Sequence, residues 1–124
     1  MRLLLDTHVV LWWRLDSRRL PRVVRRAISS ADAVFVSSAS AWEVAIKIAA
    51  GRLRLADPFG TMVTDSGFEP MAITFEHAER LLSLPSHHRD PFDRMLIAQA
   101  EVERLTLVTH DRAFEPYGVR TLWT

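Results

Sequence analysis

Short apolar runs alternate along the chain with longer stretches in which apolar residues recur at helical spacing. A short apolar run closed by polar residues is typical of a strand that a parallel sheet buries on both faces. The strands predicted in this way are residues 2–6, 33–36, 70–73, 105–109 and 119–123. The predicted helices are residues 8–15, 21–30, 39–50, 57–67, 75–83 and 91–103.

Strands that alternate with helices indicate βαβ units and an α/β fold around a mainly parallel sheet. Pro21 and Gly51 support two helix boundaries. Proline costs little at the first helical position, and glycine commonly follows the last one. No repeat, low-complexity segment or linker interrupts the pattern, so we predict one domain over residues 1–124.

The composition is that of an ordinary globular domain. The chain has 124 residues, of which 48% are hydrophobic and 25% charged. No apolar run approaches the roughly 20 residues that span a bilayer, and the N-terminal run is too short for a signal peptide. The absence of cysteine excludes disulfides and thiolate metal sites and is compatible with a reducing cytoplasm, where we expect the protein.

The basic residues are almost all arginine, since Lys47 is the one lysine among 16, and the net charge is only +1. Arginine suits bidentate contacts with phosphate, although genomic base composition also favours arginine over lysine. One arginine cluster is open to three interpretations: contact with an RNA backbone, contact with an acidic partner, or an ordinary solvated face, which is the simplest. The cluster comprises Arg18, Arg19, Arg22, Arg25 and Arg26.

Polar residues close several of the predicted strands. Asp6 ends the first strand, Ser37 and Ser38 follow the second, and Asp111 follows the fourth. The carboxyl ends of parallel strands form one edge of the sheet, where ligands of such folds bind. We therefore expect these side chains to gather at that edge and to build an acidic site.

Two further acids lie on helices that begin near the same edge. Glu43 is in the second turn of the helix after the second strand, and Asp93 is in the first turn of helix 91–103. Neighbouring carboxylates raise one another's pKa, and a bound cation removes that conflict. Mg²⁺ and Mn²⁺ prefer oxygen ligands and phosphate substrates. The pattern therefore predicts Mg²⁺- or Mn²⁺-dependent hydrolysis of phosphodiesters.

Each acid also has a purely structural interpretation. Asp6, Asp90 and Asp111 suit helix N-caps, and an acid in the first helical turn is favoured by the helix dipole. Glu43 precedes Lys47 by four residues, the favoured order for a helical ion pair. The convergence of the acids on one edge favours a site over four separate structural roles.

Aromatic and histidine residues near these acids leave alternatives open. Trp12 and Trp13 point about 100° apart on a helix and cannot easily share one core, so one of them is a candidate for a protein–protein surface. His8 and His110 adjoin the acids without metal-ligand spacing, and we expect at most an indirect role. Residues 87–89 (His-His-Arg) either contact phosphate or have no role.

Successive segments of the chain resemble the motifs of PIN domains and, more narrowly, of the VapC-type toxins of bacterial toxin–antitoxin pairs. The resemblance runs in order from residue 3 to about residue 123, and its last two segments are the most specific. The segments are 3–7 (LLLDT), 37–47 (SSASAWEVAIK), 88–100 (HRDPFDRMLIAQA) and 107–114 (LVTHDRAF).

The resemblance implies a three-layer α/β/α sandwich with a central, mainly parallel sheet. It implies a Mg²⁺- or Mn²⁺-dependent endoribonuclease that forms a homodimer. It also implies a small antitoxin that covers the acidic cleft, in a heterotetramer or a larger assembly. Two alternatives remain. A phosphoacceptor receiver domain fits poorly, because the first strand ends in the single acid Asp6 and Lys47 lies within a helix. A non-catalytic PIN-like RNA- or protein-binding module is the other.

Site residues follow from the resemblance by position. The four acids of the family correspond to Asp6, Glu43, Asp93 and Asp111. Asp90 is an additional acid, so the choice between Asp90 and Asp93 stays open. The small hydroxyl residues beside the metal correspond to Thr7 and to Ser37 or Ser38, of which we favour Ser38.

Overall fold

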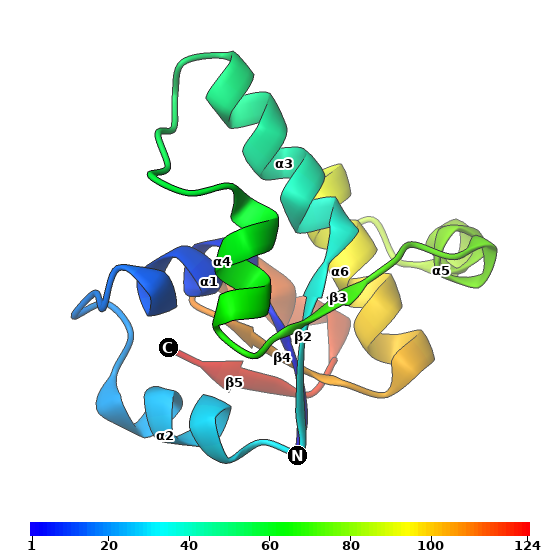
Figure 1. The fold of residues 1–124 in the computed structure, drawn as a ribbon. Coiled ribbons are helices and arrows are strands. Elements are labelled where there is room, and N and C mark those ends of the chain that lie inside the picture. Colours follow the sequence, from blue (N-terminus) through cyan, green and yellow to red (C-terminus); the bar gives the residue numbers. More distant parts are fainter.

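The computed structural model describes residues 1–124 and contains one five-stranded sheet (Figure 1). The strands are β1 (Arg2–Leu5), β2 (Ala33–Ser37), β3 (Glu69–Met71), β4 (Thr106–Thr109) and β5 (Thr121–Trp123). They lie in the order β3-β2-β1-β4-β5, and every pairing is parallel. The five predicted strands and their parallel arrangement are thus confirmed.

Each predicted helix also has a counterpart, with ends that differ by a few residues. The helices are α1 (Thr7–Arg14), α2 (Arg22–Ser30), α3 (Ser38–Ala49), α4 (Phe59–Asp65), α5 (Phe75–Arg80) and α6 (Pro91–Glu103). Two short 3-10 helices are η1 (Leu81–Ser83) and η2 (Arg112–Tyr117). No helix combines the length and the apolar character that crossing a membrane requires.

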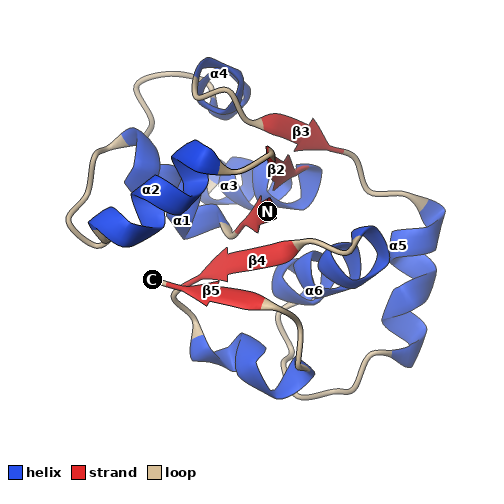
Figure 2. Cartoon of the chain, turned by 90° about the horizontal axis from the view of Figure 1, so that it is seen from below, coloured by secondary structure: helices blue, strands red, loops and turns tan.

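Side chains bury the sheet on both faces. Alternate residues of a strand point to opposite sides, so Leu3 and Leu5 join the core beneath α1, α2 and α4, whereas Leu4 joins the core beneath α6 and η2. Figure 2 shows these helices on the two sides of the strands. Each buried leucine stabilises the fold by about 1.5–3 kcal/mol. The predicted three-layer α/β/α architecture is confirmed.

The strand order places a switch point at the carboxyl ends of β1 and β4. From β1 the chain proceeds to β2 and β3 on one side, and then crosses to β4 and β5 on the other. Leu5 pairs with Val108, and the backbone N–H of Asp6 donates to the carbonyl of Val108 at 2.9 Å. Asp6 and Thr109 therefore lie side by side, at the place where sheets of this kind bind ligands.

Candidate metal and active site

Strand β1 delivers Asp6 to the switch point, where Asp6 is also the N-cap of α1. The Thr7 N–H donates to Oδ1 of Asp6 at 2.7 Å, and the Thr109 hydroxyl donates to Oδ2 at 2.7 Å. Only 6% of Asp6 is exposed. Burial raises the pKa of Asp6, against the opposing effect of the Thr109 and Thr7 hydrogen bonds. The N-cap role predicted for Asp6 is thus confirmed, and its metal-binding role stays a prediction.

Asp90 and Asp93 have different roles at the start of α6. One oxygen of Asp90 accepts the N–H groups of Phe92 at 2.8 Å and Asp93 at 3.1 Å, so Asp90 is the helix cap. Asp93 caps nothing, and its Oδ2 lies 2.6 Å from Nε2 of His88. The geometry therefore favours Asp93 over Asp90 as the acid that faces the site.

The pKa of Asp93 is well above the ordinary value of a carboxyl group. Its burial and the negative charge of Asp6 raise the pKa of Asp93 to about 7, although the hydrogen bond from His88 lowers it. Desolvation and like charges both oppose ionisation of a buried carboxylate, and here they outweigh the contact with His88. A cation held among these oxygens would favour the ionised form of Asp93.

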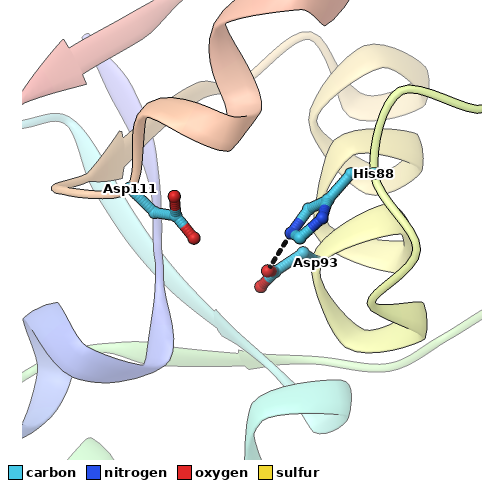
Figure 3. A group of neighbouring side chains, drawn as sticks. All are labelled: His88, Asp93 and Asp111. Carbon is cyan, nitrogen blue, oxygen red and sulfur yellow. Dashed lines mark hydrogen bonds and ion pairs between the residues drawn. The ribbon is translucent and has the colours of Figure 1, made fainter.

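Asp111 approaches the same point from the end of β4. It is the N-cap of η2, where one oxygen accepts the Ala113 N–H at 2.9 Å. Ligand atoms of His88, Asp93 and Asp111 all lie within 4.8 Å of one another. Figure 3 shows the Asp111 carboxylate directed toward the His88–Asp93 pair. Thr109 links two of the acids, since its hydroxyl donates to Asp6 and accepts from the Asp111 N–H at 3.1 Å.

Glu43 forms the predicted ion pair, and its role in a metal site stays a prediction. Its Oε2 lies 3.7 Å from Nζ of Lys47, which is the expected ion pair along α3. Its charge is also close enough to contribute to the raised pKa of Asp6. Glu43 thus faces the acidic edge while it is paired, and it is absent from the tight cluster that His88, Asp93 and Asp111 form.

The hydroxyl beside Thr7 belongs to Ser40 and not to Ser38. The Thr7 hydroxyl donates to the Ser40 hydroxyl at 2.8 Å, and both residues are buried. Ser37 accepts the Ala39 N–H at 3.0 Å as the N-cap of α3, and Ser38 is exposed. Helical spacing offered the signal, because the residue three after a cap turns back toward the strand that precedes the helix.

His88 is the site residue to which the sequence assigned no definite role. Its backbone N–H donates to the Tyr117 hydroxyl at 2.7 Å. Arg94 holds the same loop by donating to the Pro85 carbonyl at 2.8 Å. The loop before α6 is thereby fixed with the imidazole directed at Asp93. A histidine shortly before a capped, acidic helix start was the available signal.

The comparisons with known proteins agree with this geometry. A family model for the PIN domain matches residues 3–119. The chain belongs to the PIN-domain family. Ribonuclease VapC22 of Mycobacterium tuberculosis is 34% identical to this PIN domain over 112 residues, which are 88% of this chain and 86% of the relative. The resemblance to VapC-type PIN domains is thus confirmed.

Solved structures share the fold of this PIN domain. VapBC2 from Rickettsia felis, bound to a promoter DNA fragment, matches with a TM-score of 0.72 at 14% identity, over 98% of this chain and 97% of that chain. DNA-bound VapBC from Salmonella typhimurium matches with a TM-score of 0.69 at 21% identity, over the same shares.

The donor atoms of this PIN domain fit a hard divalent cation. Carboxylate oxygens are the ligands that Mg²⁺ and Mn²⁺ prefer, whereas thiolates, which would select softer ions, are absent. The raised pKa of Asp93 fits as well, because a cation would offset the burial and the charge of Asp6 that disfavour the ionised carboxylate.

Proposed function

We propose that this PIN domain is a Mg²⁺- or Mn²⁺-dependent endoribonuclease and the toxin of a toxin–antitoxin pair, which inhibits translation and growth by cleaving RNA in the cytoplasm. The observation that carries the proposal is the Asp93 carboxyl, which is buried beside Asp6 and near Asp111 with a pKa of about 7. His88 is the one side-chain partner of Asp93, and its hydrogen bond does not offset the burial and the neighbouring negative charges that raise this pKa. The relative named Ribonuclease VapC22 supports cleavage of RNA as the activity.

The residues of the site would act together on a phosphodiester. Four carboxylates would hold the cation, and when bound the cation offsets phosphate charge and makes water a stronger nucleophile. They are Asp6, Glu43, Asp93 and Asp111. Thr109 and the Thr7 N–H fix both oxygens of Asp6, so that this carboxylate cannot rotate away. The contact between His88 and Asp93 would fix the orientation of the Asp93 carboxylate toward the cation.

Partner chains complete the proposal. Two of the structural relatives are VapBC structures, and another was solved as a "toxin-antitoxin complex from Klebsiella pneumoniae". Apolar side chains are exposed on this chain at Leu15, Trp42, Ile46 and Ile48, as expected of a protein that forms assemblies. We propose a homodimer of the toxin and a heterotetramer or larger assembly with a small antitoxin.

A cleavage assay tests the proposed activity. Purified parental protein should cleave labelled total RNA in Mg²⁺ or Mn²⁺ and should be inactive in EDTA. Asp6→Asn and Asp93→Asn should keep the fold, by circular dichroism, and lose both cleavage and growth inhibition. If parental protein binds RNA without metal-dependent cleavage, the non-catalytic module is the correct interpretation.

Co-expression tests the partners. A small open reading frame beside the gene should encode a protein that copurifies with this chain and suppresses cleavage. Light scattering on the purified toxin should give about twice the 14.2 kDa of one chain. A 14.2 kDa monomer that no neighbouring gene product binds would contradict the assembly.

A further inference from the structure

A cavity of about 370 Å³ opens beside the acidic centre. Asp6 and Asp111 form one part of its wall, so it adjoins the proposed cleavage site. The remaining wall is aromatic and basic: Trp12 from α1, Arg19 from the loop after α1, and Arg112 from η2. A cavity of this size suits one small planar group and not a helix, which is about 10–12 Å across with its side chains.

The aromatic wall is organised around Trp12. His8 is stacked near its ring, with centroids 6.0 Å apart and planes 28° apart. His110 meets the same indole edge-on at 5.8 Å. Trp12 and Trp13 both pack against the core under α1, but Trp13 is directed at Phe68 and does not line the cavity. Of the two tryptophans, only Trp12 presents its ring beside the acids.

The arginines of the wall have no carboxylate partners. Arg19 lies over the Trp12 ring, 6.0 Å from its centroid, and Arg112 lies 4.2 Å from the centroid of Trp123. Neither forms an ion pair. Arg25 of the same basic cluster is structural by contrast, because it donates to the carbonyls of Trp12 and Ser17. Arg19 and Arg112 are therefore available to an anionic ligand.

We infer that this cavity binds one unpaired nucleobase of the RNA substrate against Trp12, while Arg19 and Arg112 contact the flanking phosphates. The inference rests on the proposed nuclease function, since the substrate supplies the base next to the cleaved phosphate. Aromatic stacking with arginine contacts to the backbone is how proteins bind single-stranded nucleic acid. An acidic peptide fits less well, because its carboxylate side chains offer no planar ring to stack on Trp12.

We expect the cavity to discriminate between RNA structures. A base inside a duplex is stacked on both faces and cannot enter the cavity, so single-stranded RNA or a loop should be bound in preference to a helix. Stacking tolerates any base, because every base has a π-face. The cavity thus favours unpaired RNA at the cleavage position.

Binding measured without cleavage tests the cavity separately from the chemistry. All proteins carry Asp93→Asn, and the probes are fluorescein-labelled single-stranded rA12 and a 12-base-pair RNA duplex, measured by anisotropy. Trp12→Leu should weaken rA12 binding at least about five-fold, the lower bound for loss of one stacked base. Trp13→Leu, the matched control with a similar loss of packing, should leave rA12 binding unchanged. The duplex should bind more weakly and should not respond to Trp12→Leu.

Salt dependence separates stacking from charge. Arg19→Gln and Arg112→Gln should each reduce the slope of log affinity against log salt by about 0.7, the value for one phosphate contact on a single strand. Trp12→Leu should lower affinity without changing the slope. Equal rA12 affinity for Trp12→Leu and Trp13→Leu would overturn the inference and would leave the nuclease proposal intact. Absence of RNA cleavage by parental protein, with Trp12-dependent binding preserved, would refute the nuclease proposal alone.

Two further outcomes are decisive. If Trp12→Leu weakens binding of a copurified antitoxin and not of rA12, the cavity is a protein-docking site and the inference is wrong. If Trp12→Leu does not fold, the binding measurement on this variant is replaced by quenching of tryptophan fluorescence by rA12. Trp12→Phe should then lose most of the quenching seen with the Trp12 protein, and equal quenching would contradict the inference.

Discussion

Helix α6 has a histidine–acid pair near each end, and only one of the two pairs lies among further carboxylates that could hold a cation. At the amino end, His88 Nε2 lies 2.6 Å from Asp93. At the carboxyl end, His77 Nε2 lies 3.0 Å from Glu103. The chemical groups are an imidazole and a carboxylate in both cases.

The His77–Glu103 pair at the carboxyl end has a structural role. His77 is 1% exposed, and its Nδ1 accepts the Thr74 N–H at 3.1 Å, so Nε2 carries the proton and donates to Glu103. The Thr74 hydroxyl accepts the His77 N–H in return, which completes a capping box for α5. A nearby acid, Glu101, is paired with Arg80. No carboxylate there is left to hold a cation.

The pair at the amino end differs because it meets additional acids. Asp111 is within ligand distance of the pair, and the charge of Asp6 raises the pKa of Asp93. A histidine–acid pair is therefore a candidate metal site only where further carboxylates converge on it. The carboxyl edge of the sheet provides that convergence.

The largest predicted difference between the two ends is in catalysis. Asp93→Asn should reduce Mg²⁺-dependent RNA cleavage at least about 100-fold, because it removes a charge that the cation requires. Glu103→Gln, the matched change at the other end of α6, should cleave at the parental rate. Initial rates on a labelled RNA measure both. Parental activity in Asp93→Asn would refute the assignment of that residue.

The next largest difference is in the free energy of unfolding, which should depend more on the histidine at the carboxyl end of α6 than on the one at the amino end. His77→Ala should lower the free energy of unfolding by about 2–3 kcal/mol, because a buried hydrogen-bond network and a helix cap are lost. His88→Ala should cost less than about 1 kcal/mol and should instead reduce cleavage roughly 10-fold or more. Urea unfolding and cleavage rates are measured on both variants. A large loss of stability in His88→Ala together with a loss of cleavage in His77→Ala would contradict the comparison.

The pH dependence of stability gives a smaller effect at the amino end. With a pKa of about 7, folded Asp93 binds more protons than in the unfolded chain, so ionisation makes the parental protein less stable as pH rises toward 7. In EDTA, Asp93→Asn should therefore be about 1–2 kcal/mol more stable than the parent at pH 8, with a smaller gain at pH 5. Chemical unfolding at both pH values measures this difference in the free energy of unfolding. A stability gain of Asp93→Asn that did not grow with pH would contradict a raised pKa of Asp93 in the folded protein.

The smallest predicted effect concerns Glu43, which is the ion-pair partner of Lys47 and also a proposed ligand of the cation. Lys47→Ala should change the free energy of unfolding by only about 0.3–0.5 kcal/mol and should not reduce cleavage. Glu43→Gln should have a similarly small effect on stability but should reduce cleavage. Equal cleavage by Glu43→Gln and the parent would leave Glu43 with the helical ion pair alone.

The sheet and most of the acidic site could be predicted because they depend on local patterns. Polar residues that end apolar runs mark the carboxyl edge, which is why Asp6 and Asp111 were found. The split between Asp90 and Asp93 depends on which carboxylate turns back to the helix N–H groups, and both spacings permit a cap. Only the three-dimensional arrangement separates them.

Contacts across the fold were not predictable in the same way. The Thr7–Ser40 hydrogen bond joins residues 33 positions apart, and the placement of His88 depends on Tyr117, 29 positions further on. The cavity beside Trp12 likewise needs α1 to lie against the segment after β4, where His110 is. Such tertiary contacts have no periodic signature in the sequence.

Calorimetric titration with Mn²⁺ tests the central claim most directly, namely that acids from separate elements meet to hold one divalent cation. Parental protein and Glu103→Gln should bind Mn²⁺ with the same affinity, whereas Asp6→Asn and Asp93→Asn should each bind it at least about 10-fold more weakly. Parental Mn²⁺ affinity in both Asp6→Asn and Asp93→Asn would contradict that claim.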